Sequence, residues 1–198
     1  MRWDLKLPRP KYGAIALWRR NFLVWRKLLG PALFLHLGEP LIYLLGLGYG
    51  LGHFIGDMAG IPYIAFLASG IVASSAMTTA SLEGTYSVFT RMVPQKTYEA
   101  VLATPTDVDD ILTGEMLWCA TKALMSGTAI LVVATLLGAT SGWSVLWVIP
   151  VVYLMGLCFA APAIVVSTFA PSYDFFNYYF TLVVTPMFIL GGVFFPIT

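Results

Sequence analysis

The chain has 198 residues, of which 59% are hydrophobic and only 11% are charged, and its mean hydropathy is +0.82. Soluble domains are roughly a quarter charged, so a soluble fold of this length would leave a large apolar patch exposed to water. Aromatic residues make up 15% of the chain, which excludes a disordered segment. The composition therefore predicts an all-α membrane protein.

Five apolar segments are long enough to cross a bilayer, which takes about 20 helical residues for a core of roughly 30 Å. They are residues 28–52, 61–82, 114–137, 145–168 and 176–195. Most connections between them are short, and the exception is the polar interval 83–113. We expect one polytopic helical bundle of five spans over residues 1–198. Since the chain stops just after Pro196, we expect it to be a fragment of a longer subunit.

Positive charge is distributed unevenly, although the net charge is only +1. Eight of the eleven Lys and Arg residues precede residue 28, and the interval 83–113 carries Arg91 and Lys96. The loops at 53–60, 139–144 and 169–175 carry none. Because Lys and Arg are enriched in cytoplasmic loops, this pattern predicts a cytoplasmic N-terminus and a cytoplasmic interval 83–113. The loop at 169–175 is placed inside only by counting spans.

Residues 12–29 have the pattern of an amphipathic helix. One arc of its helical wheel carries Ile15, Trp18, Phe22, Trp25 and Leu29. Another arc carries Arg19, Arg20, Arg26 and Lys27. This pattern predicts a helix lying in the membrane interface, with Trp at headgroup level. The alternative is a positively charged flank whose aromatic residues are incidental.

His36, Glu39, Glu115 and Lys122 fall inside expected spans, where a charged residue costs roughly 2.5–3.5 kcal/mol on insertion scales. His36 and Glu39 are spaced i, i+3 and share a helix face. They either line a substrate path or lie near the cytoplasmic interface. Lys122 either extends toward the cytoplasmic headgroups or pairs with Glu39 or Glu83 in the bundle interior.

No catalytic, metal or nucleotide motif is present in the sequence. The alternating Gly46, Gly48, Gly50 and Gly52 lack the G-x-G-x-x-G spacing and predict close helix packing instead. Cys119 and Cys158 lie in apolar stretches, which argues against a disulfide or a Cys metal site. Asp107, Asp109 and Asp110 follow Thr106, and the pattern Thr106-x-x-Asp109 predicts a helix cap. There is no P-loop, so we expect no ATP hydrolysis, cofactor or metal in this chain.

The polar interval contains a short amphipathic helix at 94–103, which Thr104-Pro105 ends, because proline disfavours helix in the residue before it. A new helix then leads from Thr106 into the third span. A short helix projecting from a cytoplasmic loop suits a groove on another protein. The alternative is an interfacial loop that has no partner.

Three stretches resemble one family of membrane proteins. They are EPLIYLLGLGYGLG at 39–52, YEAVLATP at 98–105 with DILTGE at 110–115, and TPMFILGGVFFP at 185–196. Through them the chain resembles the ABC-2 class of permeases over nearly its whole length. Within that class it is most similar to the nodulation-type (NodJ-like) lipo-oligosaccharide export permeases.

The resemblance implies a subunit with six spans, an N-terminal interface helix and a cytoplasmic coupling helix at 94–103, between spans two and three. That helix would dock on a separate P-loop ABC ATPase, with two permeases and two ATPases in the bacterial inner membrane. The implied function is ATP-driven export of an amphipathic substrate, such as a lipo-oligosaccharide or related glycolipid, by a subunit that is not itself an enzyme. Lipids and a second permease copy are the other expected partners, and nucleic acid is not expected. The alternatives are export of a drug, polyketide or polysaccharide, or a membrane-embedded transferase.

The resemblance also nominates functional residues. Those expected to contact the ATPase are Arg91, Lys96, Tyr98 and Glu99. Those expected to line a substrate cavity or gate are Glu39, Tyr43, Glu83, Glu115 and Lys122. The aromatic residues of the fifth span either touch substrate or form an interfacial belt; they are Phe175, Phe176, Tyr178, Tyr179 and Phe180.

Overall fold

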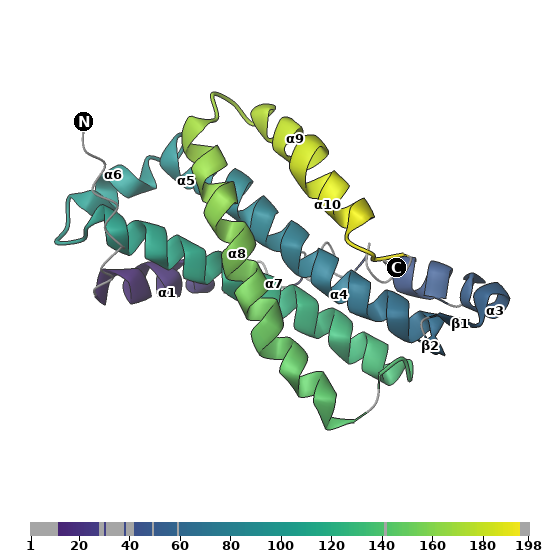
Figure 1. The fold of residues 1–198 in the computed structure, drawn as a ribbon. Helices are drawn as coiled ribbons and strands as arrows, with labels where there is room; N and C mark the ends of the chain where they lie inside the picture. Colours follow the sequence, from purple (N-terminus) through teal and green to yellow (C-terminus); the bar gives the residue numbers. More distant parts are fainter. Residues whose placement is uncertain are drawn as a thin grey trace, which may run out of the picture.

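The computed structural model describes residues 12–27, 30, 38, 42–48, 50–58, 60–140 and 142–194, and these form an elongated helical bundle (Figure 1). Three described helices are long and apolar enough to cross a membrane, namely Tyr63–Met92, Val108–Leu136 and Val145–Phe169. Two shorter apolar helical stretches lie at 42–55, in which residue 49 is not described, and at Phe175–Leu190. The all-α membrane class is confirmed, and the count of five spans stays a prediction.

The bundle is built around helix α7 (Val108–Leu136), which packs against α1 (Tyr12–Arg26), α4 (Tyr63–Leu82) and α8 (Val148–Phe169). Small residues allow these helices to approach closely. A Cβ added to Gly156 of α8 would lie 2.8 Å from the Cα of Ala120 in α7. The hydroxyls of Ser75 and Ser126 join α4 to α7 at 2.7 Å. Close backbone approach and interhelical hydrogen bonds are the forces that hold helices together where water supplies no hydrophobic drive.

The hydropathy pattern predicts that the second apolar helix ends at Leu82, but in the structure the helix continues beyond this residue. It continues through a π-helical turn, η1 (Glu83–Ser87), and through α5 (Val88–Met92). The first ten residues of the interval 83–113 are therefore helix rather than loop. At this turn a Cβ on Gly84 would lie only 2.7 Å from that of Ala163, so the extra residue of the π turn brings η1 against α8. The hydropathy pattern misplaced this boundary because it treats every charged residue as solvent-exposed. Glu83 and Arg91 therefore mark the end of the span in that pattern, although their charges are neutralised inside the bundle.

The turn after α5 leads into the short helix α6 (Thr97–Leu102), which is shorter than the expected 94–103. It starts late because Lys96 adopts a left-handed backbone with φ of 48°, a conformation that cannot continue a right-handed helix. Helix α7 begins at Val108, two residues after the expected helix start at Thr106, with a capping box between Asp107 and Asp110. The predicted cap is thus displaced by one residue, and the hydroxyl of Thr106 instead pairs with that of Thr104 at 2.6 Å.

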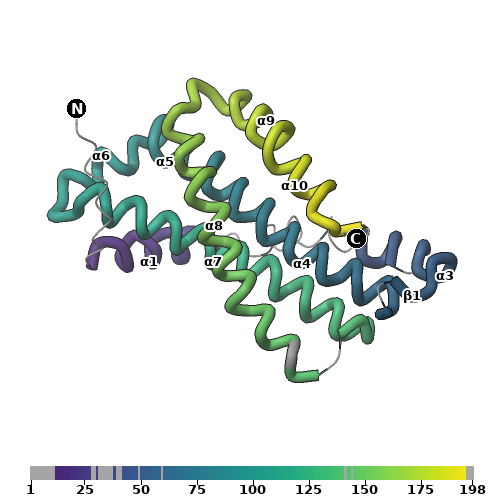
Figure 2. Tube along the Cα trace, viewed as in Figure 1, coloured from purple at the N-terminus to yellow at the C-terminus, as the bar shows by residue number. Residues whose placement is uncertain are grey.

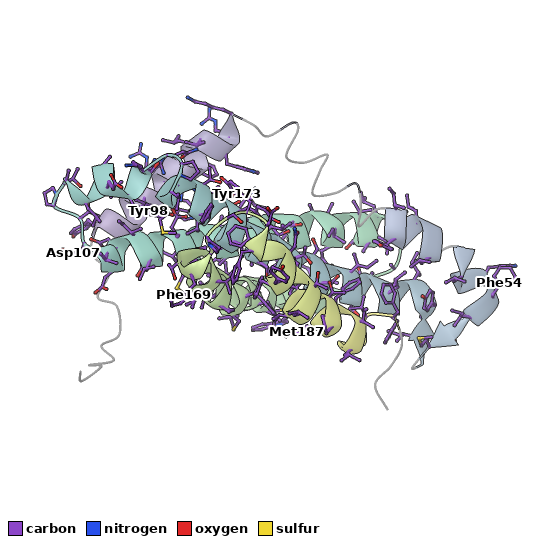
Figure 3. All side chains as sticks on the ribbon, turned by 90° about the horizontal axis from the view of Figure 1, so that it is seen from above. Phe54, Tyr98, Asp107, Phe169, Tyr173 and Met187 are labelled. Atoms are coloured by element: carbon purple, nitrogen blue, oxygen red, sulfur yellow. The ribbon has the colours of Figure 1, made fainter. Side chains whose placement is uncertain are left out.

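The opposite end of the bundle carries α3 (Gly52–Ile55) and a hairpin of β1 (Asp57–Met58) and β2 (Ile61–Pro62). The strands are antiparallel, with Met58 paired to Ile61. Figure 3 shows Phe54 at this end and Tyr98 and Asp107 at the other. Of the alternating glycines, Gly48 faces α4, since its added Cβ would lie 3.1 Å from Ile64, whereas Gly46 and Gly50 face open space. Close packing is thus confirmed for only one side of this helix.

The last helix is assembled from α9 (Phe175–Tyr179), η3 (Phe180–Val184) and α10 (Thr185–Leu190), after the 3-10 turn η2 (Trp143–Trp147) and α8. Tyr179 and Val184 pack with Met77 of α4 and Ala163 of α8. Phe176 and Tyr179 are buried inside the protein, whereas Tyr178 is exposed. The expectation of one interfacial aromatic belt is therefore wrong for Phe176 and Tyr179.

Candidate functional site

Four charged side chains meet between the α4–α5 helix and α7, and we call them the charged cluster: Glu83, Arg91, Glu115 and Lys122. The Arg91 guanidinium donates to Glu83 Oε1 at 2.7 Å and to Glu115 Oε2 at 2.5 Å. The Lys122 ammonium lies 3.8 Å from Glu83 Oε2 and 5.7 Å from the centre of the Trp25 ring. Two acids and two bases make the cluster formally neutral.

Three neutral donors complete the cluster, two from the other helices α6 and α1 and one from α7 itself. Tyr98 of α6 donates its hydroxyl to Glu115 Oε1 at 3.0 Å, and Asn21 of α1 donates its amide to Glu115 Oε2 at 3.1 Å. Trp118 donates its indole N–H to Glu83 Oε1 at 2.8 Å. Burial, together with the Glu115 carboxylate, raises the pKa of Tyr98 above its ordinary value, so its hydroxyl keeps its proton and remains a donor.

Burial makes the charged cluster sensitive to the loss of any one member. Only 1% of the Glu115 side chain and 14% of the Arg91 side chain are exposed. Each charge has been removed from water, and the free energy of its desolvation is offset only while its partners stay in place. Removing one partner from such a group typically costs about 3–5 kcal/mol. The cluster therefore ties together the elements that supply it, namely α1, η1, α5, α6 and α7.

Helix α1 packs lengthwise along the first half of α7 (Figure 2). Gly114 permits this approach, because a Cβ there would lie 2.9 Å from both the Ala14 carbonyl oxygen and the Leu17 Cβ. Trp18 adds a hydrogen bond from its indole N–H to Thr121 Oγ1 at 2.9 Å. The covered face of α1 is therefore centred on Ala14, Leu17 and Asn21, which are buried.

The face of α1 that α7 covers differs from the expected apolar arc. Ile15, which that arc includes, is 61% exposed, whereas Trp18, Phe22 and Trp25 are partly covered. The helical wheel could not show this covered face, because it contains no information about the neighbouring helix. Its placement in the membrane interface stays a prediction.

A cavity of about 420 Å³ opens beside the charged cluster. Its walls come from α1, from η1 and α5, from α7 and from the turn between α8 and α9. The lining side chains are Arg20, Asn21, Val24, Trp25, Glu83, Tyr86, Ser87, Thr90, Arg91, Gln95, Trp118, Lys122 and Tyr173. Polar and aromatic groups thus dominate a cavity of a size typical for small-molecule sites.

An aromatic group connects this region to the second half of the chain. The Tyr173 ring stacks on Tyr86 with centroids 6.1 Å apart and meets Phe89 edge-on at 4.9 Å. The hydroxyls of Tyr173 and Thr90 are 2.8 Å apart. Phe176 packs edge-on against Tyr86 at 4.9 Å. Through these contacts, the turn between α8 and α9 is joined to the helix that carries Arg91.

The residues expected to contact an ATPase divide into two pairs. Arg91 and Tyr98 turn inward to Glu115, as described above. The side chains of Lys96 and Glu99 are 69% and 70% exposed and lie 4.0 Å apart at their charged ends. Contact of any of the four with an ATPase stays a prediction.

The residues expected at a cavity or gate are also separated by the structure. Glu83 and Lys122 line the cavity, and Glu115 lies behind Arg91. Tyr43 lies elsewhere, with its ring 6.5 Å from that of Phe194. Glu39 falls outside the described residues, as does His36. Of the two roles considered for Lys122, the structure shows pairing with Glu83 in the interior.

Sequence reasoning missed three members of this region, Asn21, Trp25 and Trp118. Asn21 carried a usable signal, because it stands on a helix next to aromatic residues and falls on the same face as Leu17. Trp25 and Trp118 carried none, since their indole groups match any interfacial or core position. Among the described residues, no group of three or more His, Cys, Asp or Glu side chains could hold a metal ion.

Comparison with known proteins agrees with this architecture. The family described as ABC-2 type transporter matches residues 12–198. The chain is 49% identical to nodulation protein J of Rhizobium meliloti (strain 1021) over 191 residues, which cover 96% of this chain and 73% of that protein. It is 50% identical, with the same coverage, to nodulation protein J of Rhizobium leguminosarum bv. trifolii.

A more distant relative is the inner membrane transport permease YadH of Escherichia coli (strain K12), 26% identical over 79% of this chain and 61% of that protein. No solved structure matches the chain. The long apolar helices and these relatives define an integral membrane subunit of a transporter. The chain belongs to the ABC-2 type transporter family, and it is a NodJ-like permease within it.

Proposed function

We propose that this permease works with a separate P-loop ATPase and exports an amphipathic lipo-oligosaccharide or related glycolipid. We further propose that it acts as a dimer in the bacterial inner membrane, with its N-terminus in the cytoplasm. The resemblance to nodulation-type permeases supports the substrate class, and the name of the Escherichia coli relative supports the membrane. The Lys and Arg residues before residue 28 support the orientation.

The observation that carries the coupling part of this proposal is the link from α6 to the charged cluster. Tyr98 is the residue of α6 that reaches Glu115, and Glu115 is bonded in turn to Arg91 and Asn21. A displacement of α6 therefore has to be shared by α1, α5 and α7 or has to break buried hydrogen bonds. ATP would then drive transport by favouring one of two arrangements of these helices.

The outer face of the same turn is suited to docking. Lys96 and Glu99 offer both signs of charge, and Val93 and Leu102 are about half exposed beside them. Apolar anchors with flanking charges are the usual components of a helix that enters a groove. In this arrangement Lys96 and Glu99 meet the ATPase, while Arg91 and Tyr98 hold α6 on the bundle.

Docking is tested by charge reversal. The Lys96→Glu/Glu99→Arg double variant keeps the net charge of the turn but reverses its pattern, and we expect it to lose co-purification with the ATPase. The matched control is Asp57→Arg in the hairpin at the other end of the bundle, which should leave association unchanged. Retained association after replacement of residues 97–102 by a Gly-Ser linker would refute the docking assignment.

Coupling is tested separately with Tyr98→Phe, which removes one hydroxyl and keeps the ring. We expect the ATPase to remain bound while the amount of substrate moved per ATP hydrolysed falls. Unchanged transport per ATP would show that the Tyr98–Glu115 bond does not transmit the motion.

The substrate class is tested in inside-out membrane vesicles supplied with ATP and a labelled lipo-chito-oligosaccharide. Uptake that requires both ATP and the permease supports the proposal. Uptake of a polyketide drug or a lipid-linked polysaccharide in its place would assign one of the other ABC-2 substrate classes.

A further inference from the structure

The walls of the cavity beside the charged cluster contain more positively charged side chains than carboxylates. Its walls contain Arg20, Arg91 and Lys122 but only Glu83 as an acid. Glu115 lies behind Arg91 and balances a second cation. The charged cluster is therefore neutral, and Arg20 contributes one further positive charge to the walls.

Arg20 lies at the edge of this cavity. Its Nη1 donates to Asn21 Oδ1 at 3.2 Å, and no carboxylate in the described part of the chain lies within ion-pair distance of it. An amide oxygen satisfies a hydrogen bond but does not neutralise the guanidinium. The other guanidinium donors are in the fork geometry that suits a phosphate or carboxylate.

A second unused donor belongs to Trp25. Its indole N–H is buried and has no hydrogen-bond acceptor among the described residues. An indole nitrogen can only donate, so the missing group must be an acceptor. Buried donors in native proteins are nearly always paired, and a small adjustment of the ring toward an acceptor in the cavity would pair this one. Arg20 and Trp25 can therefore both donate hydrogen bonds to acceptor atoms of a ligand, and the positive charge of Arg20 favours a negatively charged ligand.

The position of the cavity in the chain indicates where such a ligand comes from. Helix α1 ends at Arg26, and the apolar segment 28–52 follows it directly. Arg20 and Trp25 thus stand where the chain passes from a surface helix to a segment expected to enter the bilayer, which is the level of the lipid headgroups. We propose that the cavity binds the phosphodiester headgroup of an anionic membrane phospholipid, with Arg20 and the Trp25 indole as its donors. The site is independent of the exported substrate and of the ATPase.

The test uses the full-length permease, purified in detergent and equilibrated with a mixture of phosphatidylglycerol and phosphatidylcholine. Native mass spectrometry then counts the lipids that stay bound. Arg20→Gln is compared with Arg19→Gln, which removes the same charge from the neighbouring, exposed position of the same helix. We expect one retained phosphatidylglycerol on the parent protein, about tenfold less on Arg20→Gln and no change on Arg19→Gln. Trp25→Phe keeps an aromatic ring without the N–H and should lower retention severalfold, which keeps the test open if Arg20→Gln folds poorly.

Four results would overturn the proposal. Equal loss from Arg19→Gln and Arg20→Gln would show only general attraction to anionic lipid, and equal retention of both lipids would show no selection for charge. Displacement by millimolar glycerol 3-phosphate would assign the site to a soluble phosphate rather than to a lipid. Displacement by a labelled lipo-oligosaccharide would make the cavity part of the substrate path.

Discussion

Replacement of Arg91 by methionine removes the one side chain that bridges both carboxylates of the charged cluster. Methionine keeps most of the length of the arginine stem, so the change removes charge and hydrogen bonds with little loss of packing volume. Arg91→Met leaves Glu83 with Lys122 and Trp118, and it leaves Glu115 with only the neutral donors Asn21 and Tyr98. An acid that is 1% exposed then has no cation beside it.

The expected cost of Arg91→Met is about 3–5 kcal/mol in the free energy of unfolding, the range for breaking a buried ion pair from one side. At about 2–4 °C per kcal/mol for a domain of 150–250 residues, the thermal midpoint should fall by about 6–20 °C. The measurement is thermal aggregation of the detergent-solubilised permease, followed by size-exclusion chromatography. The second variant is Arg91→Met/Glu115→Gln, which also removes the stranded acid and should recover part of the loss.

The matched control is Lys96→Met, which removes a positive charge from the same turn. Lys96 and Glu99 form an exposed i, i+3 pair at 4.0 Å, and such pairs contribute about 0–1 kcal/mol. If Arg91→Met lowered the midpoint no more than Lys96→Met does, the charged cluster would not hold these helices together. Failure of the Glu115→Gln change to recover stability would show that the cost does not come from the unpaired acid.

Three further predictions concern packing and ionisation. Gly114→Leu should cost about 1–3 kcal/mol by forcing α1 away from α7, whereas Gly46→Ala, which meets open space, should not lower the thermal midpoint. Because the folded protein raises the pKa of Tyr98, its contribution is fully present below the ordinary tyrosine pKa of about 10 and is lost as the pH rises beyond it. Thermal midpoints measured from about pH 9 to about pH 11, one unit either side of that value, should therefore fall more steeply for the parent protein than for Tyr98→Phe, and equal slopes would contradict the assignment. Tyr173→Ala removes three aromatic contacts worth about 0.5–1.5 kcal/mol each and should lower the midpoint, while Tyr173→Phe, which loses only the bond to Thr90, should lower it less.

The apolar composition of the sequence was sufficient to predict a helical membrane protein, because burial in lipid depends on the apolar content of a segment and hardly on its neighbours. The three stretches at 39–52, 98–115 and 185–196 together pointed to the family, which the comparisons confirm. Helix boundaries were less accurate. Glu83 and Arg91 looked like the end of a span, although each is neutralised by a partner that the local sequence does not show.

The tertiary structure decided which charges meet. Glu83 and Arg91 are eight residues apart on one helix, but Glu115 and Lys122 come from the next long helix, and Asn21 comes from α1. Hydropathy and spacing report the faces of single helices, whereas these contacts depend on the register and rotation of helices that pack together. From the sequence alone, pairing with Glu83 was therefore one of several possible roles for Lys122. Helix packing places the two residues together, and this arrangement is stable because a buried charge needs its partners beside it.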